Sequence, residues 1–362
     1  MQNQLTYFGI LKAPTSWAKV SRQLLYSLCK TDTDINIFER KGFLYNPEFE
    51  IDNCITDKIT DNFRNDTVWT FEHPLAYHYL KGKKKIGILT YESTIVPHHW
   101  IENANKYLDL ALVSSSFCRD IFIHAGMDKS KIEILNYGYD PAIFNPHGIK
   151  LDTSIYSNKK FKFINVVSPH KRKGLEQLFK AYSSAFSNKD DVSLLIKVNY
   201  TPKKKSMPFE YRDLKKMFDT FSKKPLNPEV VLITGYFTEN KLASLYRGCN
   251  ALVSATRGEG FGLVPLEAMA CGLPVIVTGW SGHMDYITKD NALIVDYKLR
   301  KAKEIQYDCE SPDSLIAEPS IESLASKMIT VVKTPDNIPK TPPPLRLTWD
   351  NLTQYFLKLI KQ

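Results

Sequence analysis

The sequence predicts an α/β protein built from two doubly wound parallel sheets. Three observations support this. The chain has 362 residues, which is long for one core and enough for two domains. Short apolar runs alternate with longer helical segments along most of it, as in folds with parallel sheets. Residues 146–160 interrupt the alternation with a polar stretch that contains Pro146 and Gly148. We therefore expect domains at 1–145 and 161–340, joined by a linker at 146–160.

In the first domain, short runs rich in β-branched and aromatic residues predict the strands. These runs are Tyr7–Leu11, Ile35–Phe38, Thr67–Phe71, Lys85–Thr90, Leu110–Ser114 and Ile132–Leu135. Helices are expected after the loop 12–17, ending near Lys30, after His73-Pro74, and after an N-cap at Ser116. Ligands of such sheets bind at the carboxyl ends of the strands.

The second domain repeats the alternation. Its expected strands are Phe161–Val167, Val192–Val198, Val230–Thr234, Ala251–Ala255 and Val275–Thr278. Its expected helices are Gly174–Phe186, a long basic helix within 201–226, Lys241–Arg247, one that follows Gly262, and Ile321–Val332. The polar residues 298–313 are expected to form a loop. A proline-rich spacer at 335–344 precedes a last helix at 348–361, so 345–362 is treated as a separate C-terminal segment.

The most informative stretch is EGFGLVPLEAMACGLPVIVT, which begins at Glu259. Its glycines allow a tight turn and close approach of a ligand, and Pro265 suits the first turn of a helix. A strand, a glycine-rich turn and a helix N-terminus form an anion site. Glu259 and Glu267 flank this site and suit neutral hydroxyl groups rather than phosphate. Phosphate and polyol together describe a nucleotide-sugar. The alternative is an ordinary strand-turn-helix with solvated glutamates.

This stretch resembles the E-x7-E signature of retaining glycosyltransferases of family four, which have the GT-B fold. The resemblance implies that Glu259 contacts the transferred sugar and that Glu267 binds the ribose hydroxyls. It also implies backbone contacts to the sugar and diphosphate from Gly260, Phe261, Gly262 and Leu263. In that family the terminal helix crosses back onto the N-terminal domain, and we expect the same here.

A basic turn, SPHKRKG, starts at Ser168 and lies between a strand and a helix. Cations beside a helix N-terminus can neutralise a departing diphosphate. Lys173 matches the lysine of the resembled family, whereas the usual arginine position is displaced, so Arg172 or Lys171 takes its place. We count Lys173 and Arg172 as catalytic candidates and Ser168 as a donor-binding one. A solvated basic turn is the alternative.

Other candidates follow strand ends. Tyr236, in the turn after Val230–Thr234, is at the position where relatives hold the base. Glu92 follows the fourth strand, where many relatives have a histidine, and we count it as catalytic. Asp285 either replaces a family glutamate or caps the next helix. His73 and His99 are more often structural residues in such positions.

Composition bounds the other possibilities. The net charge of +9 is uneven: residues 1–145 carry 16 basic and 17 acidic side chains, and 146–362 carry 32 and 22. A basic half suits a nucleoside diphosphate or an anionic surface. Six scattered cysteines without a C-x-x-C pair indicate neither disulfides nor a metal site, and therefore a cytoplasmic protein. Nothing resembles a nucleic-acid motif. No signal peptide or membrane-spanning run is visible, so a lipid-linked acceptor would be met at the membrane surface.

The sequence therefore predicts a retaining, metal-independent glycosyltransferase that moves a sugar from a UDP- or GDP-sugar to a hydroxyl of a glycan or lipid-linked acceptor. The single D-x-D string, Asp32-Thr-Asp34, is interpreted as a loop, and no cofactor is expected. Two alternatives remain: a non-catalytic nucleotide-sugar-binding subunit, and a GT-B epimerase or phosphorylase.

Overall fold

The structure is a computed structural model that describes residues 4–41, 45–46, 49–64, 67–199 and 209–361. The chain divides into two compact units. Unit 1 contains residues 1–138, 308–311 and 345–362, and unit 2 contains 139–307 and 312–344. The division at Gly138 lies ahead of the predicted linker at 146–160.

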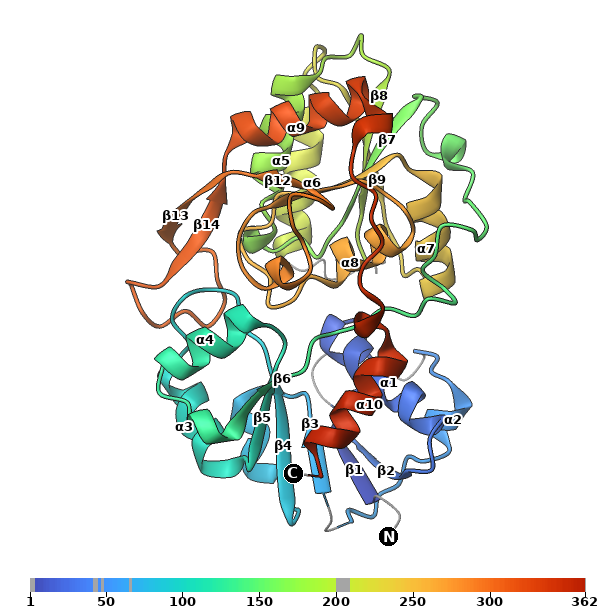
Figure 1. Cartoon of the computed structure of the whole chain (residues 1–362). Coiled ribbons are helices and arrows are strands. Elements are labelled where there is room, and N and C mark those ends of the chain that lie inside the picture. Colours follow the sequence, from blue (N-terminus) through green and yellow to red (C-terminus); the bar gives the residue numbers. More distant parts are fainter. Residues whose placement is uncertain (1–3, 42–44, 47–48, 65–66, 200–208, 362) are drawn as a thin grey trace. The chain divides into compact units, whose positions relative to one another are not determined.

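Unit 1 is built on a six-stranded parallel sheet in the order β2-β1-β3-β4-β5-β6 (Figure 1). The strands are β1 Gln4–Gly9, β2 Asp34–Glu39, β3 Thr67–Thr70, β4 Lys84–Leu89, β5 Leu110–Val113 and β6 Ile132–Ile134. All four residues of β5 are buried, as expected of a strand covered on both faces. The strand order reverses between β1 and β3, which is the position of ligand sites in doubly wound sheets.

The helices of unit 1 cover this sheet. They are α1 Ser16–Cys29, α2 Asn53–Thr56, α3 His98–Tyr107, α4 Ser116–His124 and α10 Trp349–Leu359, with 3-10 turns at Pro74–Tyr79, Lys129–Lys131 and Leu345–Leu347. The terminal helix α10 lies beside α1 (Figure 1), and Ser27 Oγ donates a 2.8 Å hydrogen bond to Asp350 Oδ1. The predicted return of the last helix to the N-terminal domain is therefore confirmed.

Unit 2 contains a second six-stranded parallel sheet, in the order β12-β11-β10-β7-β8-β9. Its strands are β7 Phe161–Val166, β8 Val192–Lys197, β9 Glu229–Ile233, β10 Ala251–Ser254, β11 Val275–Thr278 and β12 Leu293–Val295. Its helices are α5 Leu175–Ala185, α6 Phe209–Ser222, α7 Glu239–Gly248, α8 Leu263–Ala270 and α9 Ile321–Lys333, with 3-10 turns at Thr153–Ile155, Lys171–Lys173, Gly282–Asp285 and Pro335–Asn337.

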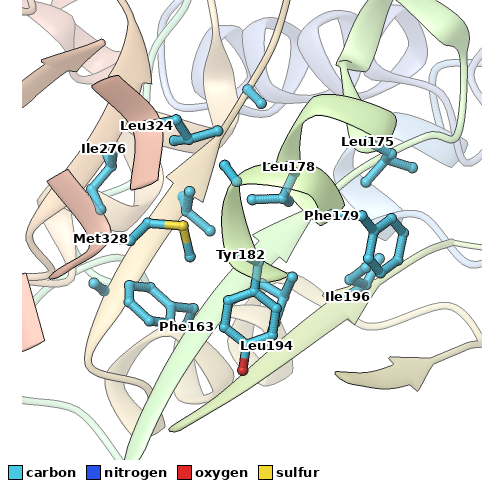
Figure 2. Close-up of a cluster of buried hydrophobic side chains, with 14 of the residues drawn as sticks. Phe163, Leu175, Leu178, Phe179, Tyr182, Leu194, Ile196, Ile276, Leu324 and Met328 are labelled. Carbon is cyan, nitrogen blue, oxygen red and sulfur yellow. The ribbon is translucent and has the colours of Figure 1, made fainter. Parts of the chain in front are cut away.

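A single apolar cluster packs α5 and α9 against this second sheet. Figure 2 shows Leu178 and Tyr182 of α5 near Phe163 of β7, with Leu324 and Met328 contributed by α9. These five side chains are fully buried. The cluster anchors the two strands, β7 and β10, from whose ends the candidate site extends.

Two expectations about elements need correction. The predicted loop 298–313 is in part a β-hairpin, formed by β13 Tyr297–Lys301 and β14 Leu315–Pro319, which pair antiparallel. The side chains of β13 are all exposed, and the brief alternation of Tyr297 and Leu299 with Lys298 and Arg300 is too short to distinguish a strand from a polar loop. The N-cap of α4 is Ser115, whose side chain accepts from Cys118 N–H, and Ser116 is the first helical residue. The start of the long helix predicted within 201–226 lies outside the described residues.

Candidate active site

The site of unit 2 forms where its strand order reverses. Read from β9 to β12, the sheet runs β9-β8-β7-β10-β11-β12, so the first and fourth strands of the unit, β7 and β10, are neighbours. The carboxyl ends of two such strands open a crevice that binds ligands in this class of sheet. The basic turn follows β7, and the Glu259 loop follows β10.

Lys173 and Glu259 form a close ion pair at this reversal point. Lys173 ends the 3-10 turn Lys171–Lys173, and its Nζ lies 2.7 Å from Oε1 and 2.9 Å from Oε2 of Glu259. The two side chains are 21% and 15% exposed, so a ligand can still reach them. The structure thus joins two of the four predicted catalytic residues.

Arg172 is the third member of this cluster. It is buried, and its guanidinium donates to the Gly258 carbonyl and lies 3.6 Å from Glu259 Oε2. Burial alone would raise the pKa of Glu259, but the charges of Lys173 and then Arg172 outweigh it and lower that pKa to about 2. Glu259 is therefore a carboxylate at neutral pH, held between two cations.

Direct backbone contact places the two loops together. Gly174 has φ +65°, and a Cβ at this position would lie 1.9 Å from the Ala255 carbonyl oxygen. Next to it, Arg257 N–H donates to the Arg172 carbonyl at 2.8 Å. Only glycine permits this approach, which explains why Gly174 follows Lys173. The close contact of the two loops also fixes the position of Lys173 relative to Glu259.

A second loop supports Glu259 from the end of β11. Ser281 Oγ accepts from Glu259 N–H at 2.8 Å, and Gly282 N–H donates to the Glu259 carbonyl at 2.9 Å. Ser281 has φ +80°, which is costly for a residue with a side chain, and a Cβ on Gly282 would lie 2.0 Å from Gly260 O. Asp285 ends the 3-10 turn that Ser281 caps, so it caps no following helix.

The glycine-rich turn leads directly into α8. Gly262 is its N-cap, with φ +92° and no side chain to cap the helix. Tyr286 Oη donates to the Gly262 carbonyl, and Phe261 is buried beside Tyr286 with ring centroids 5.2 Å apart. Leu263, the first residue of α8, is half-buried. The first N–H groups of α8 thus belong to a rigid turn without a side-chain cap, an arrangement that favours anions.

The remaining predicted residues lie at different depths. Glu267 is on α8 and only 2% exposed; burial and then its charge raise the pKa of the neighbouring Tyr246. Tyr236 is 47% exposed in the turn after β9, and Ser168 is exposed after β7. Glu92 is buried and belongs to unit 1, whereas the cluster around Glu259 belongs to unit 2.

Sequence reasoning missed Arg257. Its guanidinium forms a bidentate pair with Glu318, with Nε–Oε2 and Nη2–Oε1 distances of 3.0 Å, and it also donates to the Lys171 carbonyl. Arg300 lies 2.8 Å from Glu318 Oε2. The arginine is two residues before Glu259, but its acidic partner is 61 residues away in the sequence, so no local pattern connects them.

Sequence reasoning also missed Lys197, at the end of β8. This lysine is completely buried, and its Nζ donates to Gly235 O at 2.6 Å, Asn199 Oδ1 at 2.8 Å and Val198 O at 3.0 Å. Burial, and next the charge of Lys241, lower its pKa to about 8. Lys197 thus fixes the turn that presents Tyr236.

Part of unit 2 matches a known protein family. Residues 152–306 match the family described as glycosyl transferases group 1. The chain is 26% identical over 202 residues to the alpha-1,3/1,6-mannosyltransferase ALG2 of Homo sapiens, an alignment that covers 53% of this chain and 47% of that protein. It is 27% identical over 186 residues to the capsular polysaccharide biosynthesis glycosyltransferase CapM of Staphylococcus aureus. That alignment covers 49% of this chain and 45% of CapM.

The chain spans less than half of these relatives, and only 12% of the mannosyltransferase WbdA of Escherichia coli, to which it is 26% identical over 100 residues. Among solved structures, HepE of Anabaena with UDP and glucose superposes with a TM-score of 0.67 at 13% identity, covering 99% of this chain and 100% of that one. Sucrose-phosphate synthase of Thermosynechococcus elongatus superposes with a TM-score of 0.71 at 15% sequence identity. That alignment covers 100% of this chain and 99% of the synthase chain. These likenesses establish the GT-B fold.

Within the described residues, no helix is long and apolar enough to cross a bilayer.

Proposed function

We propose that this chain, which carries a glycosyl transferases group 1 domain at residues 152–306, moves a sugar from a nucleoside-diphosphate sugar to an acceptor hydroxyl with retention of configuration. The observation that carries the proposal is the cluster of Lys173, Arg172 and Glu259 at the reversal point of the second sheet, next to the start of α8. The named relatives transfer mannose or build capsular polysaccharide, and the HepE structures contain UDP or UDP-glucose, which supports a nucleotide-sugar donor.

The donor diphosphate would bind the cations and the free N–H groups of α8. Negative charge develops on the diphosphate as the sugar leaves, and fixed cations and helix N–H groups stabilise that charge without reorganising. Lys173 and Arg172 provide two such cations, which supports transfer without a metal ion at this site.

Glu259 would bind the transferred sugar rather than the phosphates. A carboxylate is an acceptor of hydrogen bonds, so it suits sugar hydroxyls, and its low pKa keeps it ionised throughout the physiological range. Glu259 would also orient Lys173, because its ion pair with the lysine holds the ammonium group where the phosphate would bind. Glu267 is assigned to the ribose, Tyr236 to the region of the base, and Ser168 with the backbone of 260–263 to the sugar and diphosphate.

Front-side attack follows from retention without a covalent intermediate. The acceptor hydroxyl would arrive on the face that the diphosphate leaves, and a phosphate oxygen would help to take its proton. We assign the glycan or lipid-linked acceptor to unit 1, with Glu92 as a candidate acceptor contact.

Two measurements test this proposal. The first is a thermal-shift screen with UDP- and GDP-sugars, in which the bound donor raises Tm. Lys173→Ala should abolish the shift, whereas Lys171→Ala, an exposed neighbour of the same charge, should retain it. The absence of a shift with any nucleotide sugar would contradict donor binding.

The second measurement follows a radiolabelled donor with and without acceptor. Acceptor-dependent release of nucleotide, lost in Glu259→Ala, supports transfer. Donor binding without turnover in the wild type would instead identify a non-catalytic binding subunit. Conversion of the donor sugar without any acceptor would indicate an epimerase, and phosphate-dependent cleavage a phosphorylase.

A further inference from the structure

A second cluster of chemically active side chains lies in unit 1 and shares no residue with those assigned above. His73 follows β3, His99 is in the first turn of α3, and Asp308 belongs to the four-residue segment 308–311 that forms part of this unit. The Nε2 atoms of both histidines lie 3.4 Å from Asp308 Oδ2. One ligand atom from each residue falls within 4.8 Å of the others.

These separations match the ligand spacing of a metal ion. Ligand atoms about 2.0 Å from a tetrahedral zinc ion lie roughly 3.3 Å from one another, a spacing close to both histidine–aspartate distances. Two imidazoles and one carboxylate form a common set of three protein ligands, which leaves a coordination position open for water or substrate.

The surrounding residues orient the ligand atoms as outer contacts of metal sites do. Glu310 Oε1 lies 2.7 Å from His99 Nδ1, so a proton on Nδ1 has an acceptor and Nε2 can then bind a metal ion. Trp100 Nε1–H donates to Asp308 Oδ2 at 2.6 Å, which fixes the carboxylate. Without a metal ion, only a doubly protonated His99 could donate to both Glu310 and Asp308.

The backbone of Asp308 also indicates a specialised position. Its φ is +50°, one of only two positive values among the non-glycine residues that the structure describes. Tyr91 Oη donates to its carbonyl at 3.1 Å and so helps to hold this conformation. Such strained residues concentrate at ligand sites.

We propose that His73, His99 and Asp308 bind a divalent transition-metal ion, with zinc as the best match, and that the ion fastens the segment 308–311 within unit 1. His73 contributes through Nε2. Its Nδ1 accepts a long 3.3 Å bond from Leu75 N–H, so metal binding through Nε2 requires the ring proton to move from Nε2 to Nδ1, with loss of the bond from Leu75. The site includes none of the cations assigned to the donor, so its occupancy can be measured whether or not sugar transfer is observed.

The test is a zinc titration of the chelator-treated full chain by calorimetry, with dialysis and elemental analysis as a second readout. We expect one equivalent of zinc and a raised Tm. His99→Ala and Asp308→Ala should lower the affinity at least tenfold, and Glu310→Gln about 10- to 100-fold, as outer contacts of metal sites do. His98→Ala is the matched control, because His98 is the neighbouring residue, is 78% exposed and pairs with Glu102 on the surface. It should bind zinc like the wild type.

X-ray absorption of the zinc-loaded wild type tests the ligands without any variant. Two imidazole nitrogens and an oxygen at about 2.0 Å support the assignment. A sulfur ligand would overturn it, since Cys309 is adjacent in the sequence. Substoichiometric uptake, or uptake that His99→Ala leaves unchanged, would also overturn it.

Discussion

Arg257 and Glu318 form a bidentate ion pair that joins the candidate catalytic loop to the β13–β14 hairpin. Arg257 is 6% exposed in its side chain, and its backbone carbonyl also accepts from Ala317 N–H at 3.0 Å. The same guanidinium donates to the Lys171 carbonyl, at the start of the turn that contains Lys173. The β13–β14 hairpin therefore supports the turn that carries Lys173, the main cation of the proposed donor site.

Glu318→Gln should weaken this support without removing any ligand-binding side chain. A neutral amide cannot accept two charged bonds from Arg257, so we expect a loss of stability of roughly 1–3 kcal/mol and a lower kcat with a smaller change in KM. Arg300→Gln is the matched control, since Arg300 pairs with the same carboxylate through a single 2.8 Å contact to Oε2 and is 48% exposed. Denaturant unfolding and steady-state kinetics measure both. Equal effects of the two variants would contradict the central role of Arg257.

Gly174→Ala and Gly235→Ala form a pair that separates backbone strain from steric conflict. Both glycines have positive φ, +65° and +99°, but an added Cβ meets Ala255 O at 1.9 Å in the first case and nothing within 4 Å in the second. Gly235→Ala should therefore cost only the left-handed strain of about 1–2 kcal/mol. Gly174→Ala should cost more and also displace Lys173. Urea unfolding and donor-induced Tm shifts measure this, and equal stability losses would disprove the proposed contact.

The centre of the candidate site could be predicted from residues 259–278, because the residues that form it are close together in the sequence. Glycines, a helix start and Glu259 are contiguous, and Lys173 is placed by the glycine that follows it. The other supports depend on the sheet. Arg257 meets Glu318 only because β14 pairs with β13, and the exposed β13 offers just a brief alternation of Tyr297 and Leu299 with lysine and arginine. Lys197 is the last residue of a largely apolar strand, and its hydrogen-bond acceptors come together only in the folded chain, where the turn at Gly235 lies beside β8. Glu92 is buried in unit 1, so its role remains a prediction.

Acid should weaken the protein through Glu259. Its pKa is about 2 in the folded chain, below its ordinary value of 4.5. A depressed carboxyl pKa stabilises the fold above the unfolded value, and this contribution disappears as pH falls from about 4.5 to about 2. The stability difference between wild type and Glu259→Gln should therefore shrink over that interval. Unfolding free energies from pH 6 to pH 2.5 provide the measurement, and a difference independent of pH would refute the assignment.

The lowered pKa of Lys197 predicts that the free energy of unfolding depends on pH in the alkaline range. Its folded pKa of about 8 lies below the ordinary 10.5, because burial penalises the charged form. Between these two values the unfolded chain binds the proton and the folded chain does not, so the stability contributed by this residue rises with pH. The free energy of unfolding of the wild type, minus that of Lys197→Met, should increase from pH 8 to pH 10. Lys241→Met is the control, since Lys241 lies 4.2 Å from the Phe237 ring that the Lys197 ammonium also contacts, at 4.5 Å, and this variant removes a charge while keeping the buried lysine. A difference that stays constant from pH 8 to pH 10 would mean that the buried ammonium stays charged on its three acceptors.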